Sequence, residues 1–110
     1  MDKTMASSIL AEWAQNTANP ERQKWCYDKL LAQFLTDERA TISFIRNEQS
    51  HENLDLIAQL LPELAYQYNS HIFLRQMENI CAYHNSDLWL KNLAKALTKV
   101  KTPEIDRMDF

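Results

Sequence analysis

The sequence of 110 residues contains no glycine, only two cysteines and only three prolines. Folds built from β-hairpins usually need glycine at turns and bulges, where the backbone takes a positive φ. The absence of glycine also excludes the loop that holds a nucleotide phosphate and the G-x-S-x-G turn of a nucleophilic serine. Helices joined by short Asn, Ser and Asp connections suit this composition, so we predict an all-α chain.

Long apolar runs are also missing, so we expect no membrane-spanning segment. The first residues lack the basic region and apolar stretch of a secretory signal. Cys26 and Cys81 lie far apart in the sequence, and both fall on apolar helical faces. We interpret them as buried free thiols rather than as a disulfide, which favours a cytoplasmic location.

Apolar residues that recur at three- and four-residue steps predict about six short helices. The expected starts are near residues 4, 20, 37, 51, 71 and 87. The strongest start signal is Asn19-Pro20-Glu21, and serines at 50, 70 and 86 are further candidate caps. These helices would form three successive helical hairpins, arranged as a compact bundle or as a short solenoid.

Two segments of this pattern need interpretation. Residues 41–45 have the β-branched content of a strand, but a single strand would have nothing to pair with, so we predict a helix. The apolar stripe that starts near residue 51 keeps its phase across Pro62, so we predict a kinked helix there rather than a break. We assign residues 1–101 to one helical domain. Residues 102–110 are then a C-terminal tail with apolar side chains that could dock on the domain or on a partner.

The segment Arg46-Asn47-Glu48-Gln49-Ser50-His51 resembles the R-x4-6-H signature of HEPN ribonucleases. Members of that family are small helical domains that pair to form a metal-independent RNA-cleaving site. The resemblance implies that Arg46 steadies a phosphate, that His51 transfers a proton and that Asn47 positions both. The alternative, which we favour, is a surface loop in which Arg46 ends one helix and His51 opens the next.

The sequence gives little support for a metal or cofactor site. Glu48 and His51 have the E-x-x-H spacing of di-iron bundles, but such a site needs two pairs and two further carboxylates, and the sequence has one pair. Two isolated cysteines do not make a zinc cluster. We therefore expect no metal and no cofactor, and we lean toward a protein that is not an enzyme.

The last helix carries a row of lysines. Lys91, Lys95 and Lys99 lie at four-residue steps, and no acidic residue occurs between positions 91 and 101. This row could bind an acidic protein or DNA, or it could be a solvated face that complements the helix dipole. DNA binding would place Trp89 and Asn92 beside the lysines, but the acidic middle of the chain argues against nucleic acid.

The function predicted from these patterns is a small, regulatory interaction module of the adaptor, inhibitor, immunity or chaperone type. It would dock a helical surface on another protein, with an acidic partner or a second copy of the chain as the open alternatives. Tyr66 and Tyr83 fall off the apolar stripes and are expected to be exposed. The predicted partner-binding residues are Lys91, Lys95, Lys99, Trp89, Tyr66 and Tyr83. A HEPN-like ribonuclease is the alternative function, and DNA binding through the lysine-rich last helix is the third.

Overall fold

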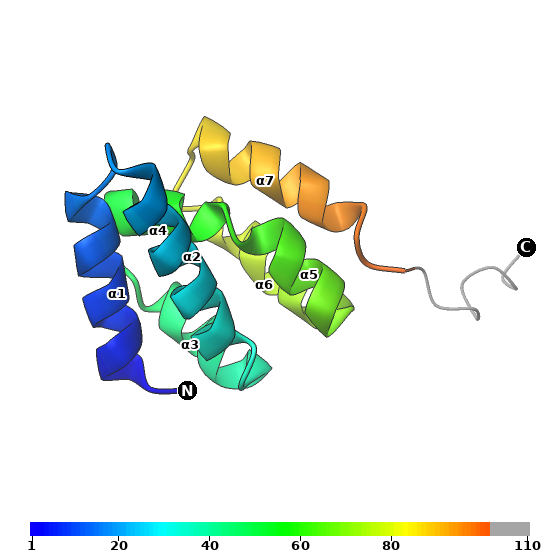
Figure 1. The fold of residues 1–110 in the computed structure, drawn as a ribbon. Helices are drawn as coiled ribbons and strands as arrows, with labels where there is room; N and C mark the ends of the chain where they lie inside the picture. The colour runs from blue at the N-terminus through cyan, green and yellow to red at the C-terminus, as the bar shows by residue number, and fades with distance from the viewer. Residues whose placement is uncertain (102–110) are drawn as a thin grey trace, which may run out of the picture.

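The computed structural model describes residues 1–101, and helices are its only regular elements there, which confirms the prediction of an all-α chain (Figure 1). The seven helices are α1 (Lys3–Gln15), α2 (Pro20–Phe34), α3 (Glu38–Arg46), α4 (His51–Ala58), α5 (Leu61–Tyr68), α6 (His71–Ile80) and α7 (Asp87–Leu97). Residues 41–45 are part of α3, so the helical interpretation of that segment is also confirmed. The predicted tail, residues 102–110, lies outside the described residues.

Most helices begin at a polar side chain that accepts a hydrogen bond from the backbone N–H three residues later. Such caps satisfy amide groups that have no partner inside the helix. The capping residues are Asp2, Asn19, Asp37, Ser50, Ser70 and Ser86, for all helices except α5. Asn69 ends α5 with a positive φ of 48° and so takes the place that a glycine usually occupies in a helix C-terminus.

The segment from His51 to Tyr68 forms two helices, so the prediction of a single kinked helix is wrong. Pro62 has no N–H to donate to the carbonyl group of Ala58, and its ring would collide with that carbonyl group in a continuous helix. The N–H groups of Gln59 and Leu60 instead bond three residues back, to Leu56 and Ile57, which closes α4. The apolar stripe keeps its phase because both helices bury their apolar sides in the same core.

The helices share one core rather than packing only as sequence neighbours. α1 lies against α2, as a predicted hairpin, but α3 packs against α6, α5 packs against α7, and α4 contacts both α1 and α7 (Figure 1). The largest fully buried side chains come from the whole described chain, and each contributes about 1.5–3 kcal/mol by its burial. They include Trp13, Phe34, Phe73 and Trp89.

Among residues 1–101, no helix combines the length and the apolar content that crossing a bilayer requires. Both cysteines are free thiols: Cys26 is buried in the core and Cys81 is half-buried. Burial raises the pKa of both thiols, and the nearby carboxylates of Glu12 and Glu78 add to the increase at Cys26 and Cys81, respectively.

Candidate functional site

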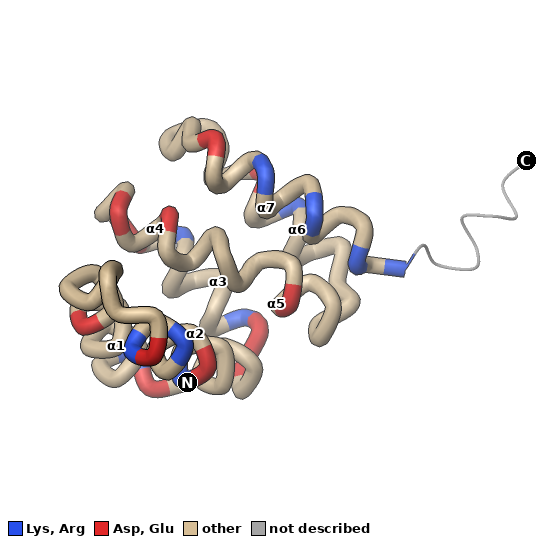
Figure 2. The backbone as a smooth tube through the Cα atoms, turned by 45° about the horizontal axis from the view of Figure 1, so that its top comes forward, with Lys and Arg blue, Asp and Glu red and all other residues tan. Residues whose placement is uncertain are grey.

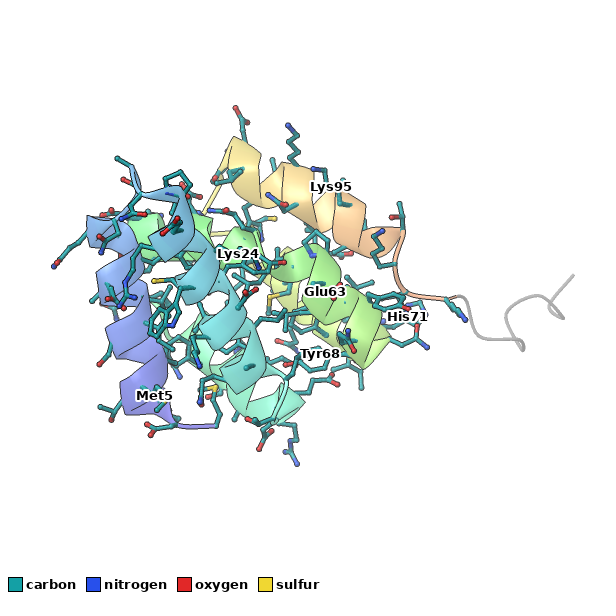
Figure 3. All side chains as sticks on the ribbon, in the orientation of Figure 1. Met5, Lys24, Glu63, Tyr68, His71 and Lys95 are labelled. Atoms are coloured by element: carbon teal, nitrogen blue, oxygen red, sulfur yellow. The ribbon has the colours of Figure 1, made fainter. Side chains whose placement is uncertain are left out.

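The outer side of α7 carries the predicted lysines. Ser86 caps the helix through the N–H of Trp89, and the four-residue spacing then puts Lys91 and Lys95 on one side, with Lys99 in the turn that follows the helix. We call these three residues the basic row. All three are exposed, and none has an ion-pair partner within residues 1–101. Figure 2 shows the basic positions spaced along α7 and the segment after it, with an acidic position only at the start of the helix, and Lys95 is labelled in Figure 3.

A second surface of α7 is apolar. Leu90, Ala94 and Leu97 are exposed at spacings of four and three residues, so they form a line along the helix that lies beside the basic row. We call them the apolar edge. Leu90 is 43% exposed and Leu97 is 48% exposed, although the helix has a separate buried side formed by Trp89, Asn92, Leu93 and Ala96. α7 therefore has more apolar surface than the core of this chain uses.

Trp89 does not reach the surface where a partner could contact it, so its prediction as a partner-binding residue is not supported. Its side chain is fully buried, and its indole Nε1 donates a hydrogen bond to the Met77 carbonyl oxygen at 3.1 Å. Asn92 is also buried and donates to the carbonyl oxygen of Leu88. Of the residues expected to face DNA, only the lysines remain on the exposed side of α7.

Tyr66 and Tyr83 are exposed, at 59% and 50%, as their positions off the apolar stripes predicted. Tyr66 lies in a shallow hollow with Lys99 and Lys101, beside the end of α7. Tyr83 lies just after α6, where its hydroxyl group donates to the carbonyl oxygen of Arg46 at 3.3 Å, and partial burial raises its pKa. The structure thus brings Tyr66, but not Tyr83, together with the basic row.

Arg46 and Asn47 line a groove of about 550 Å³ between α3 and α6. We call it the α3–α6 groove. Its walls are Arg39, Ile42, Ser43, Arg46 and Asn47 from α3 and its end, and Ile72 and Gln76 from α6. His51 is not part of these walls. It is the first residue of α4, and its side chain contacts His84 instead. The three residues of the HEPN-like motif therefore do not line one common pocket.

His51 instead belongs to a polar network that the sequence analysis did not identify. Its Nδ1 lies 2.6 Å from Nδ1 of His84, whose Nε2 lies 2.8 Å from a carboxylate oxygen of Asp55. Ser86 donates to the same oxygen at 2.7 Å. The ring centroids are 4.9 Å apart, and the planes of the two imidazole rings differ by 23°. We call these four residues the His51–His84 network.

One arrangement of hydrogens satisfies every contact in this network. His84 is buried, and its Nε2–H donates to Asp55, which leaves its Nδ1 as an acceptor. His51 then donates from Nδ1, so its Nε2 keeps a lone pair on an exposed side chain. Through the Asp55 carboxylate, the network also holds Ser86 at the start of α7.

Sequence spacing could not reveal this network because its two histidines are 33 positions apart. His84 carries no local motif, and only the packing of α4 against α7 brings it to His51. In the described part of the chain, this network included, no cluster of three or more His, Cys, Asp or Glu side chains is arranged to hold a metal ion.

Comparison with models of known protein families finds no match, and comparisons with characterised proteins and with solved structures find none either. The candidate functional features of the described residues are the outer side of α7, the α3–α6 groove and the His51–His84 network.

Proposed function

We propose that the protein is a non-enzymatic interaction module that docks the outer side of α7 on a partner protein. The observation that carries this proposal is the division of this surface into two parts. The basic row has no ion-pair partner within residues 1–101, and the apolar edge leaves two leucines about half exposed.

The two parts also define the chemistry of the partner. An apolar edge gains free energy when it is covered by aliphatic or aromatic side chains, because apolar area leaves water. Three unpaired lysines attract an acidic surface and fix its orientation more than they add to affinity. The partner is therefore an acidic protein with an apolar strip beside its carboxylates. This chemistry suits an adaptor or inhibitor with a regulatory role.

Affinity capture from the native host, with matched variants as bait, tests this proposal. The α7 bait carries Lys91→Glu, Lys95→Glu and Lys99→Glu. The control bait carries Lys3→Glu, Lys24→Glu and Lys29→Glu, which change the same charge on α1 and α2. We expect a protein that binds the wild type and the control but is lost by at least roughly ten-fold from the α7 bait, since several charge contacts of about 0.5–1 kcal/mol add up. Equal recovery by all three baits would contradict docking through α7.

A separate variant tests the apolar edge. Leu90→Ser with Leu97→Ser removes apolar surface without changing charge, and both residues are exposed, so the fold should tolerate the change. The proposal expects this variant to lose the same protein as the lysine variant. Retention by the serine variant would show that charge alone drives the capture, which is the behaviour of non-specific attraction rather than docking.

A second candidate function, the HEPN-like ribonuclease, is favoured by one observation. His51 is exposed and is backed by His84 and Asp55, which is an arrangement that supports proton transfer. This candidate expects cleavage of single-stranded RNA in the presence of a metal chelator, abolished by His51→Ala and by Arg46→Ala. No cleavage by the wild type would leave the interaction module as the function. The separation of Arg46 from His51 places this candidate second.

A further inference from the structure

The walls of the α3–α6 groove are joined by a hydrogen bond near each end. Near the start of both helices, the Ser70 hydroxyl group donates to a carboxylate oxygen of Glu38 at 2.7 Å. Near their other ends, the Tyr83 hydroxyl group donates to the carbonyl oxygen of Arg46 at 3.3 Å. These bonds and the packing of α3 against α6 fix the walls relative to one another. A ligand therefore finds a largely formed site, which lowers the cost of ordering it.

The groove presents two positive charges. Arg39 and Arg46 lie seven residues apart on the same side of α3, which corresponds to about 10.5 Å along a helix axis. Both are exposed, and neither has an ion-pair partner within residues 1–101. Glu38, the acidic neighbour of Arg39 in the sequence, accepts from Ser70 instead. Because a guanidinium group donates two parallel hydrogen bonds to a carboxylate, the groove fits a ligand with two carboxylates about 10 Å apart.

The surface between the arginines suits a peptide better than a nucleic acid. Ile42 lies between them on α3, and Ile72, which is 69% exposed, forms the facing wall. Gln76 follows one turn after Ile72 on the same wall, and its side-chain amide can both donate to and accept from a peptide backbone. Single-stranded RNA is usually bound by stacking bases on aromatic rings, and the described residues that line this groove include no aromatic side chain.

We infer that the α3–α6 groove binds a short acidic peptide segment of another protein. In an extended conformation with three residues per turn, residues three apart share an edge at a spacing of about 9 Å. Two carboxylates at this spacing pair with Arg39 and Arg46. Aliphatic side chains on the neighbouring edge of the segment cover Ile42 and Ile72, and the Gln76 amide bonds its backbone. This site is separate from the outer side of α7 and does not depend on docking there.

A peptide titration followed by NMR of the full chain tests this inference. The probe is the synthetic peptide acetyl-Pro-Asp-Leu-Pro-Asp-Leu-Pro-amide, in which the prolines favour the extended conformation. We expect saturable shifts of the amide resonances of Ile42, Ile72 and Gln76. The same peptide with asparagine at both aspartate positions should bind roughly five- to thirty-fold more weakly, because two exposed ion pairs are lost.

Matched variants of the protein locate the binding site. Arg39→Gln with Arg46→Gln should weaken binding of the aspartate peptide by a similar factor, roughly five- to thirty-fold. Lys91→Gln with Lys95→Gln removes the same charge from α7 and should change the affinity by less than about two-fold at physiological ionic strength, where the screening length is about 8 Å. Ile72→Ser changes an exposed side chain and should weaken the aspartate and asparagine peptides alike, since both lose the same apolar contact.

Four outcomes would overturn the inference. The first is an absence of saturable shifts in the groove, and the second is equal affinity for the aspartate and asparagine peptides. The third is a loss of binding with the lysine variant but not with the arginine variant, because the acidic probe would then bind the basic row. The fourth is tighter binding of hexauridylate than of the aspartate peptide at the same amides, which would make the groove a nucleic-acid site. None of these outcomes decides whether α7 docks on a partner, which the capture experiment measures separately.

Discussion

α2 and α7 are built from similar residues and use them in opposite ways. Each carries one tryptophan and several cationic side chains. In α2, Trp25 lies on the surface at 39% exposure, with the guanidinium carbon of Arg22 only 4.2 Å from the ring centroid. In α7, Trp89 lies in the core and the lysines face outward without ion-pair partners in residues 1–101.

The charges of α2 are balanced by its neighbours. Arg22 pairs with Glu12 of α1, and Lys24, labelled in Figure 3, pairs with Asp28 one turn further along at 2.9 Å. None of the lysines of the basic row forms an ion pair in the described chain. The comparison shows that composition alone does not make a binding surface. What matters is whether the fold leaves the side chains without partners.

The largest expected effect comes from replacing each of the two tryptophans by alanine. Trp89→Ala should lower the free energy of unfolding by about 3–5 kcal/mol, since it leaves a cavity in the core. Trp25→Ala should lower it by less, about 1–2 kcal/mol, because Trp25 is 39% exposed and its loss removes partial apolar burial and a surface cation–π contact but leaves no closed cavity. Urea denaturation followed by circular dichroism measures both. Equal losses would show that the two helices do not differ in this way, and Trp89→Phe is a milder variant if Trp89→Ala does not fold.

The second prediction concerns how α7 is held at its start. His84→Ala removes the buried link between His51 and Asp55 and should lower the free energy of unfolding by about 1–3 kcal/mol. His51→Ala removes one contact of an exposed side chain and should cost about 0.5–1 kcal/mol. We expect His84→Ala, but not His51→Ala, to speed amide hydrogen exchange in the first turn of α7, which would show that the lost stability comes from the start of this helix. A larger loss with His51→Ala would contradict this order.

The third prediction concerns how α2 is held at its end, where the Tyr68 hydroxyl group donates to the Phe34 carbonyl oxygen. Burial, reinforced by the carboxylates of Glu38 and Asp37, raises the pKa of Tyr68 to about 12. The neutral phenol is thus favoured by folding, and its contribution is complete below pH 10 and is lost as the pH rises through 12. We expect the wild type to lose on the order of 1–2 kcal/mol more than Tyr68→Phe over this interval. Tyr66 is exposed, so Tyr66→Phe should lose as much free energy of unfolding as the wild type when the pH rises over the same interval. Denaturation at each pH measures all three proteins.

The smallest effects should differ between the two helices. Lys24→Gln removes a favourable pair in α2 and should destabilise the protein by about 0.3–0.5 kcal/mol. Lys95→Gln relieves repulsion among lysines at four-residue spacing, but it also removes a cation from the last turn of α7, where it complements the helix dipole, so the two contributions should nearly cancel. The loss with Lys24→Gln should shrink in 1 M salt, where the screening length is only about 3 Å. A loss with Lys95→Gln as large as that with Lys24→Gln would contradict this difference.

Much of the fold could be predicted because its signals are local. Asn19 with Pro20, Ser50, Ser70 and Ser86 start helices where the sequence predicted them, since a cap needs only a side chain and an N–H three residues away. The break before Pro62 was missed because an unbroken apolar stripe was given more weight than the missing N–H group. The pairing of α3 with α6 and of α5 with α7 had no local signal.

Less of the candidate site could be predicted. The basic row follows from four-residue spacing on a helix, and the exposure of Tyr66 and Tyr83 follows from their place off the apolar stripes. The burial of Trp89 did not follow, because a stripe shows which residues share a side but not how deeply each one is covered. The walls of the α3–α6 groove come from helices far apart in the sequence, so no motif marks them.

The sequence by itself determined the helices, their caps and the order of charged and apolar residues along each one, because these features depend on contacts within a few positions. Only the tertiary structure decided that Trp89 is inside while Trp25 is outside, and that His51 meets His84 across 33 positions. It also decided which arginines and lysines are left without partners in residues 1–101. These outcomes depend on how all the helices share one core, and that competition for buried area involves the whole chain at once.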